Sequence, residues 1–313
     1  MDMKKIILSL AIAMFYCVSA NAQTPVDSTK AWHTGGFISI NFSQVSFTNW
    51  AAGGQNSIAG SGIISLFAHY KKDKTTWDNS LDVAYGMLQQ GTAKLLKSDD
   101  RIELNSKYGH YAFKHWYYSA LLNFQTQMAP GFNYPNDSTV ISKFLAPAYL
   151  VASLGMDYKP CDYFSLFLGP LTGRVVVVND QTLADQGAYG VDKAIYNTTT
   201  GALITHGKLT EEEFGGYLRA VFKKDIFTNV NLQSKLELFS NYLKNPQNIV
   251  VNWENLLMLK VNKYIVANVS TQLIYDDNIN IPQYNSAGVV TGSGPRVQFK
   301  EVLGVGLSYK FQH

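Results

Sequence analysis

The sequence has little cysteine and little charge, and both shortages narrow the class of protein. Only 16% of its 313 residues are charged and the mean hydropathy is −0.07, because uncharged polar residues and tyrosine replace much of the usual charge. Of the two cysteines, Cys17 lies in an apolar leader, which leaves Cys161 without a partner for an intramolecular disulfide. The net charge is +3, and with no basic cluster beyond residues 71–74 we expect no nucleic-acid partner.

Long apolar runs are also missing from the chain after residue 22. A membrane-spanning helix needs about 18 or more consecutive apolar residues. The longest candidate covers only residues 145–156 and contains Pro147 and Ser153. The sequence therefore excludes a multi-helix membrane protein.

The first 22 residues resemble a secretory signal peptide. Lys4 and Lys5 precede an apolar run over 6–18 that is too short to span a bilayer, and Ala20-Asn21-Ala22 places small residues where a signal peptidase cleaves. Because Met14-Phe15-Tyr16 lacks the small residue that lipidation signals place before the cysteine, we do not expect a lipoprotein. We expect export with cleavage after Ala22, a short periplasmic segment over 23–35 and a single domain over 36–313.

Apolar and polar residues alternate with a period of two along the rest of the chain. In 230–242 the even positions include Leu232, Leu236 and Leu238, whereas the odd positions include Gln233 and Lys235. The segments 77–88 and 265–275 show the same pattern. This period predicts strands with two different faces and excludes helices.

Twelve such segments occur, and their connections alternate between short and long. Single-chain outer-membrane barrels have an even number of strands, short periplasmic turns and longer extracellular loops. We therefore predict an all-β fold, a transmembrane antiparallel β-barrel of about twelve strands in an up-and-down meander, located in the bacterial outer membrane. The predicted strands are 36–48, 56–70, 75–88, 100–111, 116–128, 146–158, 162–178, 213–224, 229–242, 248–261, 264–276 and 297–311.

The apolar register is predicted to face lipid, because a strand in hydrocarbon needs apolar outward side chains. Aromatic residues such as Tyr70, Trp77 and Trp116 fall where these strands should cross the membrane interface. A soluble β-sandwich or lipocalin would turn the apolar face inward and would have shorter strands. We therefore expect the lipid bilayer to surround the barrel.

The last strand carries a specific local signal. Its odd positions are apolar or aromatic and end in Tyr309 and Phe311. The stretch 304–311 resembles the terminal targeting signal of bacterial outer-membrane barrels, although Gln312 and His313 follow the final aromatic residue. This resemblance implies recognition by the outer-membrane assembly machinery.

A second resemblance lies near the N-terminus, in Asn41-Phe42-Ser43-Gln44-Val45-Ser46-Phe47-Thr48-Asn49-Trp50-Ala51-Ala52-Gly53-Gly54-Gln55-Asn56-Ser57. With the rest of the mature chain, this segment resembles an uncharacterised Bacteroidota outer-membrane β-barrel family known only as a domain of unknown function. The resemblance covers nearly the whole chain. It implies a fold and a location, but it provides no activity and no catalytic residues.

Residues for catalysis or metal binding are sparse. His206 lies in the longest predicted loop without an adjacent serine, so acyl-transfer chemistry is not indicated. The acidic run 276–280 lacks the glycine and the distal glutamate of a calcium loop. Residues 210–213, Thr-Glu-Glu-Glu, predict only the cap of a short helix. We expect no enzyme activity, no cofactor and no metal.

Charged residues on the inward face predict a polar network in the lumen. A hairpin centred on residues 245–246 would set Glu237 opposite Glu254, with Lys235 one step along and Arg219 near Lys235. Two facing carboxylates could mark a proton-active or substrate-binding site. The favoured alternative is neutralisation by the two basic side chains. The predicted network comprises Asp78, Asp82, Lys107, Arg219, Lys235, Glu237 and Glu254.

Three functions are compatible with these features. The first is a narrow pore, or a binder or transporter of small or lipid-like molecules. The second is a structural or partner protein of an outer-membrane complex, which would use the long loop 179–212. The third, less favoured, is an outer-membrane lipid hydrolase. A small-molecule ligand or an outer-membrane protein is the partner that the first two imply.

Overall fold

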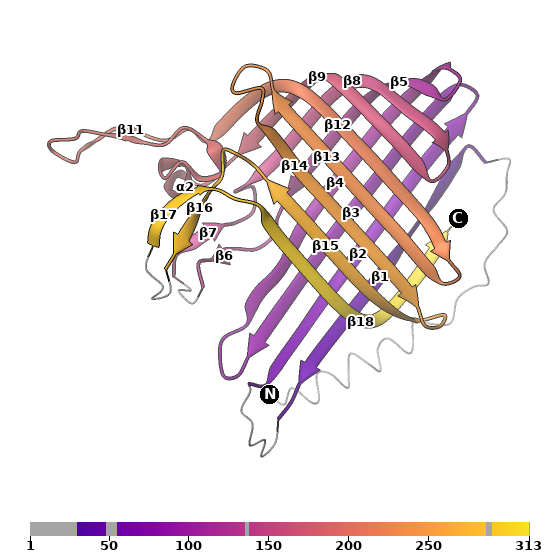
Figure 1. The fold of residues 1–313 in the computed structure, drawn as a ribbon, viewed down its shortest axis with the longest axis horizontal. Helices are drawn as coiled ribbons and strands as arrows, with labels where there is room; N and C mark the ends of the chain where they lie inside the picture. Colours follow the sequence, from indigo (N-terminus) through magenta and orange to yellow (C-terminus); the bar gives the residue numbers. More distant parts are fainter. Residues whose placement is uncertain (1–29, 48–54, 135–137, 286–289, 313) are drawn as a thin grey trace.

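Twelve long strands close into one antiparallel barrel, which confirms the predicted fold class (Figure 1). The computed structural model describes residues 30–47, 55–134, 138–285 and 290–312. The predicted signal peptide lies outside these residues. Around the barrel the order is β1-β18-β15-β14-β13-β12-β9-β8-β5-β4-β3-β2, so each long strand lies beside its neighbours in the sequence and the last strand pairs with the first.

Most strands match the predicted segments to within a few residues. The first strand begins before residue 36, because Trp32 already pairs with Tyr70. The turn predicted at 159–161 falls two residues later, since Cys161 pairs with Phe164. The barrel strands are β1 Trp32–Val45, β2 Ser57–Lys72, β3 Thr75–Gln90, β4 Leu96–Phe113, β5 Trp116–Thr126, β8 Ala148–Cys161, β9 Phe164–Val177, β12 Thr210–Phe227, β13 Val230–Asn241, β14 Ile249–Lys260, β15 Ile265–Tyr275 and β18 Gln298–Gln312.

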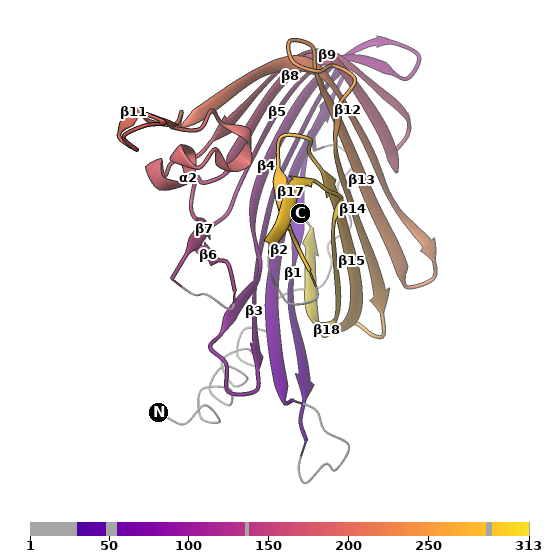
Figure 2. The ribbon, with the colours of Figure 1, turned by 60° about the vertical axis from the view of Figure 1, so that its left-hand side comes forward.

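The long connections carry short elements of their own, which Figures 1 and 2 show beside one end of the barrel. The helix predicted after residue 210 is wrong, because Thr210 pairs with Val177 and opens β12. The helix is α2, where the Asp180 carboxylate accepts a hydrogen bond from the Leu183 N–H at 3.0 Å. The short elements are β6 Gly131–Phe132, β7 Val140–Ser142, α2 Gln181–Asp185, η1 Ala188–Gly190, β10 Ile195–Tyr196, β11 Leu203–Thr205, β16 Asn280–Tyr284 and β17 Val290–Pro295.

Within the described residues, no helix has both the length and the apolar character needed to cross a membrane.

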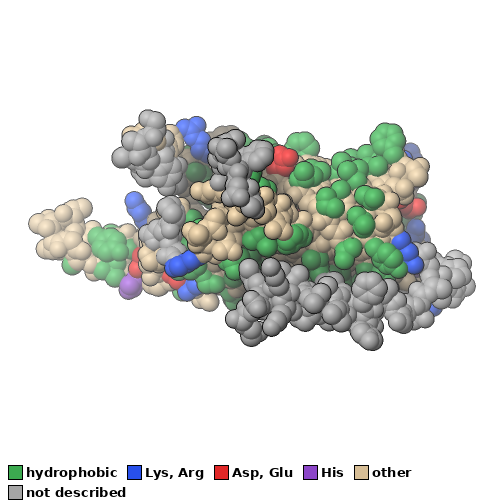
Figure 3. Space-filling view, turned by 90° about the horizontal axis from the view of Figure 1, so that it is seen from below, with side chains coloured by type: hydrophobic (Ala, Val, Ile, Leu, Met, Phe, Trp, Pro, Cys, Tyr) green, Lys and Arg blue, Asp and Glu red, His purple; other side chains and the backbone are tan. Residues whose placement is uncertain are grey.

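The exterior of the barrel is apolar and its interior is polar, the reverse of a water-soluble protein. Leu154 is 57% exposed and Leu303 is 68% exposed, whereas Glu103 and Asn123 are buried. Figure 3 shows apolar side chains spread over the barrel on the face seen from below. Since side chains alternate between the two faces of a strand, the strands place their exposed apolar set outward and most of their polar set inward. The interior also contains a buried cluster of Leu121, Phe167, Tyr217 and Phe239.

Glycine allows close contact where the barrel closes. Strands β1 and β18 pair from Gly35 opposite Gln312 to Phe42 opposite Val305. A Cβ at Gly306 would lie 1.9 Å from the Ile40 carbonyl oxygen, closer than any side chain tolerates. Closure therefore requires glycine at this position of the last strand.

Candidate functional site: the charged lumen

Six charged side chains meet inside the barrel, and we name them the central network. Three are basic and three are acidic, so the network is neutral overall. They point inward because each lies in the polar register of its strand. The members are Arg101 and Glu103 on β4, Arg219 on β12, Lys235 and Glu237 on β13, and Glu254 on β14.

One ion pair of the central network crosses the lumen. The Lys235 ammonium lies 2.7 and 2.8 Å from the two carboxylate oxygens of Glu103. In the barrel order, four strands separate β4 from β13 on one side and six on the other. Nearly opposite walls are therefore in direct contact at this level.

The other members of the central network form ion pairs at the same level of the barrel. Lys235 also lies 3.3 Å from Glu254 and 3.9 Å from Glu237. Arg101 donates to Glu254, and Arg219 lies 3.5 Å from Glu237. Each carboxylate thus has at least one cationic neighbour, which offsets the cost of taking it out of water.

Neutral side chains complete the hydrogen bonding of the carboxylates. Asn105 and Asn123 donate to Glu103 at 3.0 and 3.2 Å. Asn252 donates to Glu237 at 3.0 Å, and the Tyr217 hydroxyl donates to the same carboxylate. A network with this many partners per carboxylate holds its members in one arrangement.

The predicted pairing of Glu237 with Glu254 is wrong by two residues. Lys235 is the direct partner of Glu254, and Asn252 is the partner of Glu237. Arg219 faces Glu237 from the other side. This register sets opposite charges across the strands, whereas the predicted register would have set two carboxylates face to face.

The remaining predicted residues lie outside the central network. Asp78 binds Lys159 at 2.7 Å and His69 at 3.0 Å, near the short-turn end of the barrel. Lys107 binds Asp157 at 2.6 Å at the same end. Asp82 is the register partner of Glu103, but among the described residues no ion pair involves it.

Arg174 forms a third charged layer toward the long loops, and the sequence reading missed it. Its guanidinium donates to Glu213 at 2.9 Å and to Asp276 at 3.1 Å. The rings of Tyr149 and Phe239 flank it at 5.3 and 5.4 Å. Its position as the one charge in the apolar run 171–178 is a signal that could have identified it. Asp157 lies within the predicted strand 146–158 but was not included in the predicted network. Lys159 was missed because that strand was predicted to end at residue 158, whereas β8 continues to Cys161.

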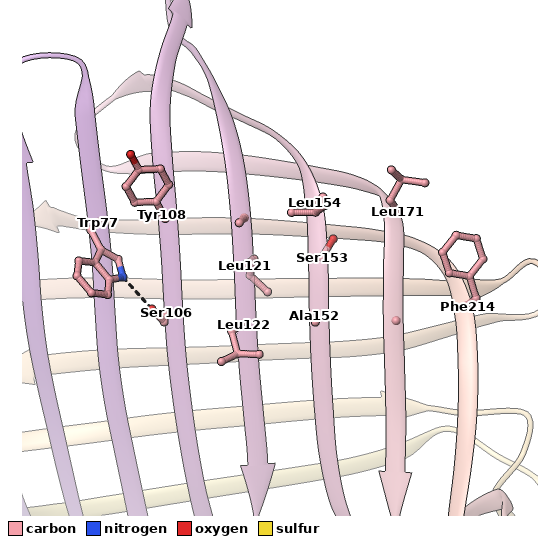
Figure 4. A pocket seen from close by; sticks show the side chains of 12 residues that line it. Trp77, Ser106, Tyr108, Leu121, Leu122, Ala152, Ser153, Leu154, Leu171 and Phe214 are labelled. Atoms are coloured by element: carbon pink, nitrogen blue, oxygen red, sulfur yellow. Dashed lines mark hydrogen bonds between the residues drawn. The ribbon is translucent and has the colours of Figure 1, made fainter.

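A groove of about 690 Å³ lies on the outer wall (Figure 4). Small residues such as Ala120, Ala152 and Gly173 form its floor between larger apolar side chains such as Leu154. At one end the Trp77 indole N–H donates to the Ser106 hydroxyl at 2.8 Å. The groove belongs to the apolar exterior and is separate from the charged lumen.

Metal ligation finds no support within the described part of the chain. There, no three or more His, Cys, Asp or Glu side chains group closely enough to hold a metal ion. The chemistry of the lumen is that of ion pairs and amides.

Fold and interior together define a class, a closed antiparallel β-barrel with an apolar exterior and a charged interior. A family described as "Protein of unknown function (DUF3078)" matches residues 42–132. The comparison with curated proteins found no match.

The solved structures that are similar to the chain include a channel, a phospholipase and the translocator domain of an autotransporter. The COG4313 outer membrane channel from Pseudomonas putida F1 is 12% identical, with a TM-score of 0.40 over 93% of this chain and 100% of that one. The outer membrane phospholipase A from Escherichia coli is 12% identical, with a TM-score of 0.36 over 91% and 94%. The translocator domain of the autotransporter NalP from Neisseria meningitidis is 11% identical, with a TM-score of 0.31 over 98% and 96%. These TM-scores are all below 0.5, so the barrel fold is established by the strand pairing within the chain itself and not by the similarity.

Proposed function

We propose that this chain is an integral protein of the bacterial outer membrane. The supporting observation is the exposed apolar exterior, which includes Ile40, Leu154 and Leu303. A closed barrel pairs its strand edges, so such a surface can be immersed in hydrocarbon. In this placement the short turns face the periplasm and the long connections face outward.

Aromatic and basic side chains at the short-turn end support the same placement. The rings of Trp32 and Tyr70 pack 5.2 Å apart, and those of Trp116 and Tyr158 pack 4.9 Å apart. The Lys224 ammonium lies 4.1 Å from the Tyr163 ring. Aromatic rings and long basic side chains favour the level of the lipid headgroups.

Within the membrane, we propose a narrow pore for small solutes that is closed at mid-height by the central network. The observation that carries this proposal is the ion pair between Glu103 and Lys235 from nearly opposite walls. A solute can pass only when this pair separates. Because the network is neutral, the constriction itself does not select strongly for one sign of charge.

We further propose that the barrel is not an enzyme. The Nδ1 atoms of His69 and His206 contact the carboxylates of Asp78 and Asp185, and among the described contacts of these two rings none is to a hydroxyl group. Hydrolysis by acyl transfer needs a histidine that contacts a hydroxyl nucleophile.

A second candidate function is docking to another surface protein, and one observation favours it. The hairpin of β10 and β11 stands away from the barrel in Figure 1. Its exposed side chains include Ile195, Tyr196 and Ile204. Exposed apolar side chains on a projecting arm are typical of interaction sites.

Planar-bilayer conductance tests the pore. The intact barrel is compared with a Glu103→Ala/Lys235→Ala double variant, which removes one charge of each sign and leaves the network neutral. The matched control is Asp192→Ala/Lys208→Ala, which removes an exposed loop pair with a 2.7 Å separation. We expect near silence from the intact barrel and the control, and steady unitary currents from the double variant.

Other outcomes would reject the proposal. Steady conductance of the intact barrel would show that the network does not close it. A folded but silent double variant would exclude a pore and would favour the docking arm. Conductance only after deletion of residues 181–210 would make the long loop, rather than the network, the barrier.

A further inference from the structure

Four inward lysines surround part of the short-turn mouth of the barrel, and we name them the mouth lysines. They are Lys71 on β2, Lys310 on β18, Lys260 on β14 and Lys223 on β12. In the barrel order one strand separates each from the next, so they cover half of the rim at regular intervals. All four side chains are exposed at the opening.

Strand register places these lysines on the lumen side. Lys71 is opposite the buried Thr76, and Lys310 is opposite Phe37, which belongs to the inward set of β1 with Ser39 and Asn41. On β12, Lys223 lies on the same face as the inward Arg219. On β14, Lys260 lies on the same face as the inward Glu254. Side chains two residues apart on a strand lie on the same face.

In the part of the chain that the structure describes, the mouth lysines have no carboxylate within ion-pair distance. Among the described residues, none of the four lies within 4.0 Å of an acidic oxygen. Two inward carboxylates at this end are already bound, Asp78 by Lys159 at 2.7 Å and Asp157 by Lys107 at 2.6 Å. A third, Asp225, accepts a hydrogen bond from the Asn231 side chain at 2.8 Å. The central network is neutral overall, so within the described residues the mouth lysines keep their positive charge without an ion-pair partner.

Lys223 extends across the opening. Its ammonium lies 5.9 Å from the centre of the Phe67 ring on β2, and Phe67 stacks on His69 at 4.9 Å. Five strands separate β12 from β2 in either direction, so these two residues come from opposite walls. A lysine from one wall thus approaches the strand that carries Lys71.

We infer that the short-turn mouth is a binding site for a small soluble anion with phosphate or carboxylate groups. The mouth lysines place four ammonium groups along half of the rim, and such an arrangement raises the local concentration of anions. A charged donor and a charged acceptor form stronger hydrogen bonds than neutral groups do. The central network lies deeper in the lumen and limits how far the ligand enters.

This inference rests on the fold and on the register, and it does not depend on the pore proposal. A barrel that never conducts would still bind the anion at its mouth. Conversely, a conducting barrel without anion binding would leave the pore proposal intact and reject the site.

Calorimetric titration of the refolded full-length mature barrel in neutral detergent, with inorganic pyrophosphate as the probe, tests the site. The mouth variant is Lys71→Gln/Lys223→Gln/Lys260→Gln/Lys310→Gln. The control is Lys72→Gln/Lys114→Gln/Lys224→Gln/Lys263→Gln, which removes the same charge from exposed lysines at the same end but outside the mouth set. We expect saturable binding that weakens more than tenfold in the mouth variant and less than threefold in the control.

Three results would overturn the inference. The first is no saturable binding to the unchanged barrel, and the second is equal weakening in both variants, which would indicate general attraction to a basic surface. The third is displacement of pyrophosphate by phosphatidylglycerol added to the micelles, which would identify a lipid headgroup as the ligand. Far-ultraviolet circular dichroism and heat-modified gel mobility confirm that each variant is folded before titration.

Discussion

Glu103 and Lys235 are 132 residues apart in the chain, and their side chains meet inside the barrel with 2.7 Å between Lys235 Nζ and a Glu103 carboxylate oxygen. Glu103 is 2% exposed, so the carboxylate depends on this ammonium and on its amide neighbours for stabilisation. The stability of the barrel is therefore sensitive to either partner.

Removal of one partner should cost more than removal of both. We expect Lys235→Met to lower the free energy of unfolding by about 3–5 kcal/mol, because it leaves a buried carboxylate without its main cation. Glu103→Gln/Lys235→Met should recover part of this loss. Urea titration of the barrel in detergent measures both. A double variant less stable than the single one would mean that the pair is not the main partner of Glu103.

Arginine substitutions should separate the two faces of the strands. Leu236→Arg and Val269→Arg place a charge on the outward face and should cost about 2–4 kcal/mol at mid-membrane. Gln233→Arg and Ser270→Arg place it in the lumen and should be much milder. Unfolding from lipid vesicles provides the comparison, and equal costs on both faces would contradict the membrane placement.

Alanine at Gly306 should prevent normal closure of the barrel. The new Cβ would lie 1.9 Å from the Ile40 carbonyl oxygen, so β1 and β18 would have to shift apart. Gly62→Ala is the matched control, because a Cβ there meets nothing within 4 Å. Heat-modified gel mobility reports the fraction folded. We expect a large loss for Gly306→Ala and none for the control, and equal mobility of both would exclude the steric conflict.

Acid should loosen the base of the long loop. A hydrogen bond from the Gly207 N–H, with further bonds from Gln181 and His206, lowers the pKa of Asp185. A carboxylate with a lowered folded-state pKa stabilises the fold above its unfolded value of about 3.9, and this contribution is lost as the pH falls through the folded-state value. Hydrogen-exchange protection of residues 181–209 should therefore hold at pH 5 and decrease below about pH 3.9.

Asp185→Asn provides the control for this pH effect. The amide cannot change its charge, so the loop should be less protected at pH 7 and should not lose further protection through Asp185 titration in acid. The same acid-dependent loss in wild type and in Asp185→Asn would assign the effect to another group.

The fold was readable from the sequence because each strand carries its own signal. Alternation on β13 separates Leu236 from Lys235 without any knowledge of the neighbouring strands. Pairing was harder to predict, because the register depends on where the chain reverses between Asn241 and Ile249, and an error of two residues leaves the alternation unchanged. The approach of Lys235 to Glu103 depends on closure of all twelve strands, which no local pattern encodes.

The sequence also does not reveal which charged residues lie close together in the folded barrel. The mouth lysines come from four separate turns and strand ends, so no window of the sequence contains a basic cluster beyond 71–74. Arg174 binds Asp276, which is 102 residues further along the chain. Proximity within a barrel follows the order of the strands and their stagger, and both appear only once the sheet is complete.

The pairing of β1 with β18 affects how the newly synthesised chain must be protected before it inserts into the membrane. The partner of β1 is β18, which is synthesised after all the other barrel strands, so one edge of β1 lacks its native partner until β18 is available. Exposed strand edges recruit other strands and promote aggregation. Protection of that edge by a helper protein between export and insertion would therefore matter more for this chain than the speed at which any single hairpin forms.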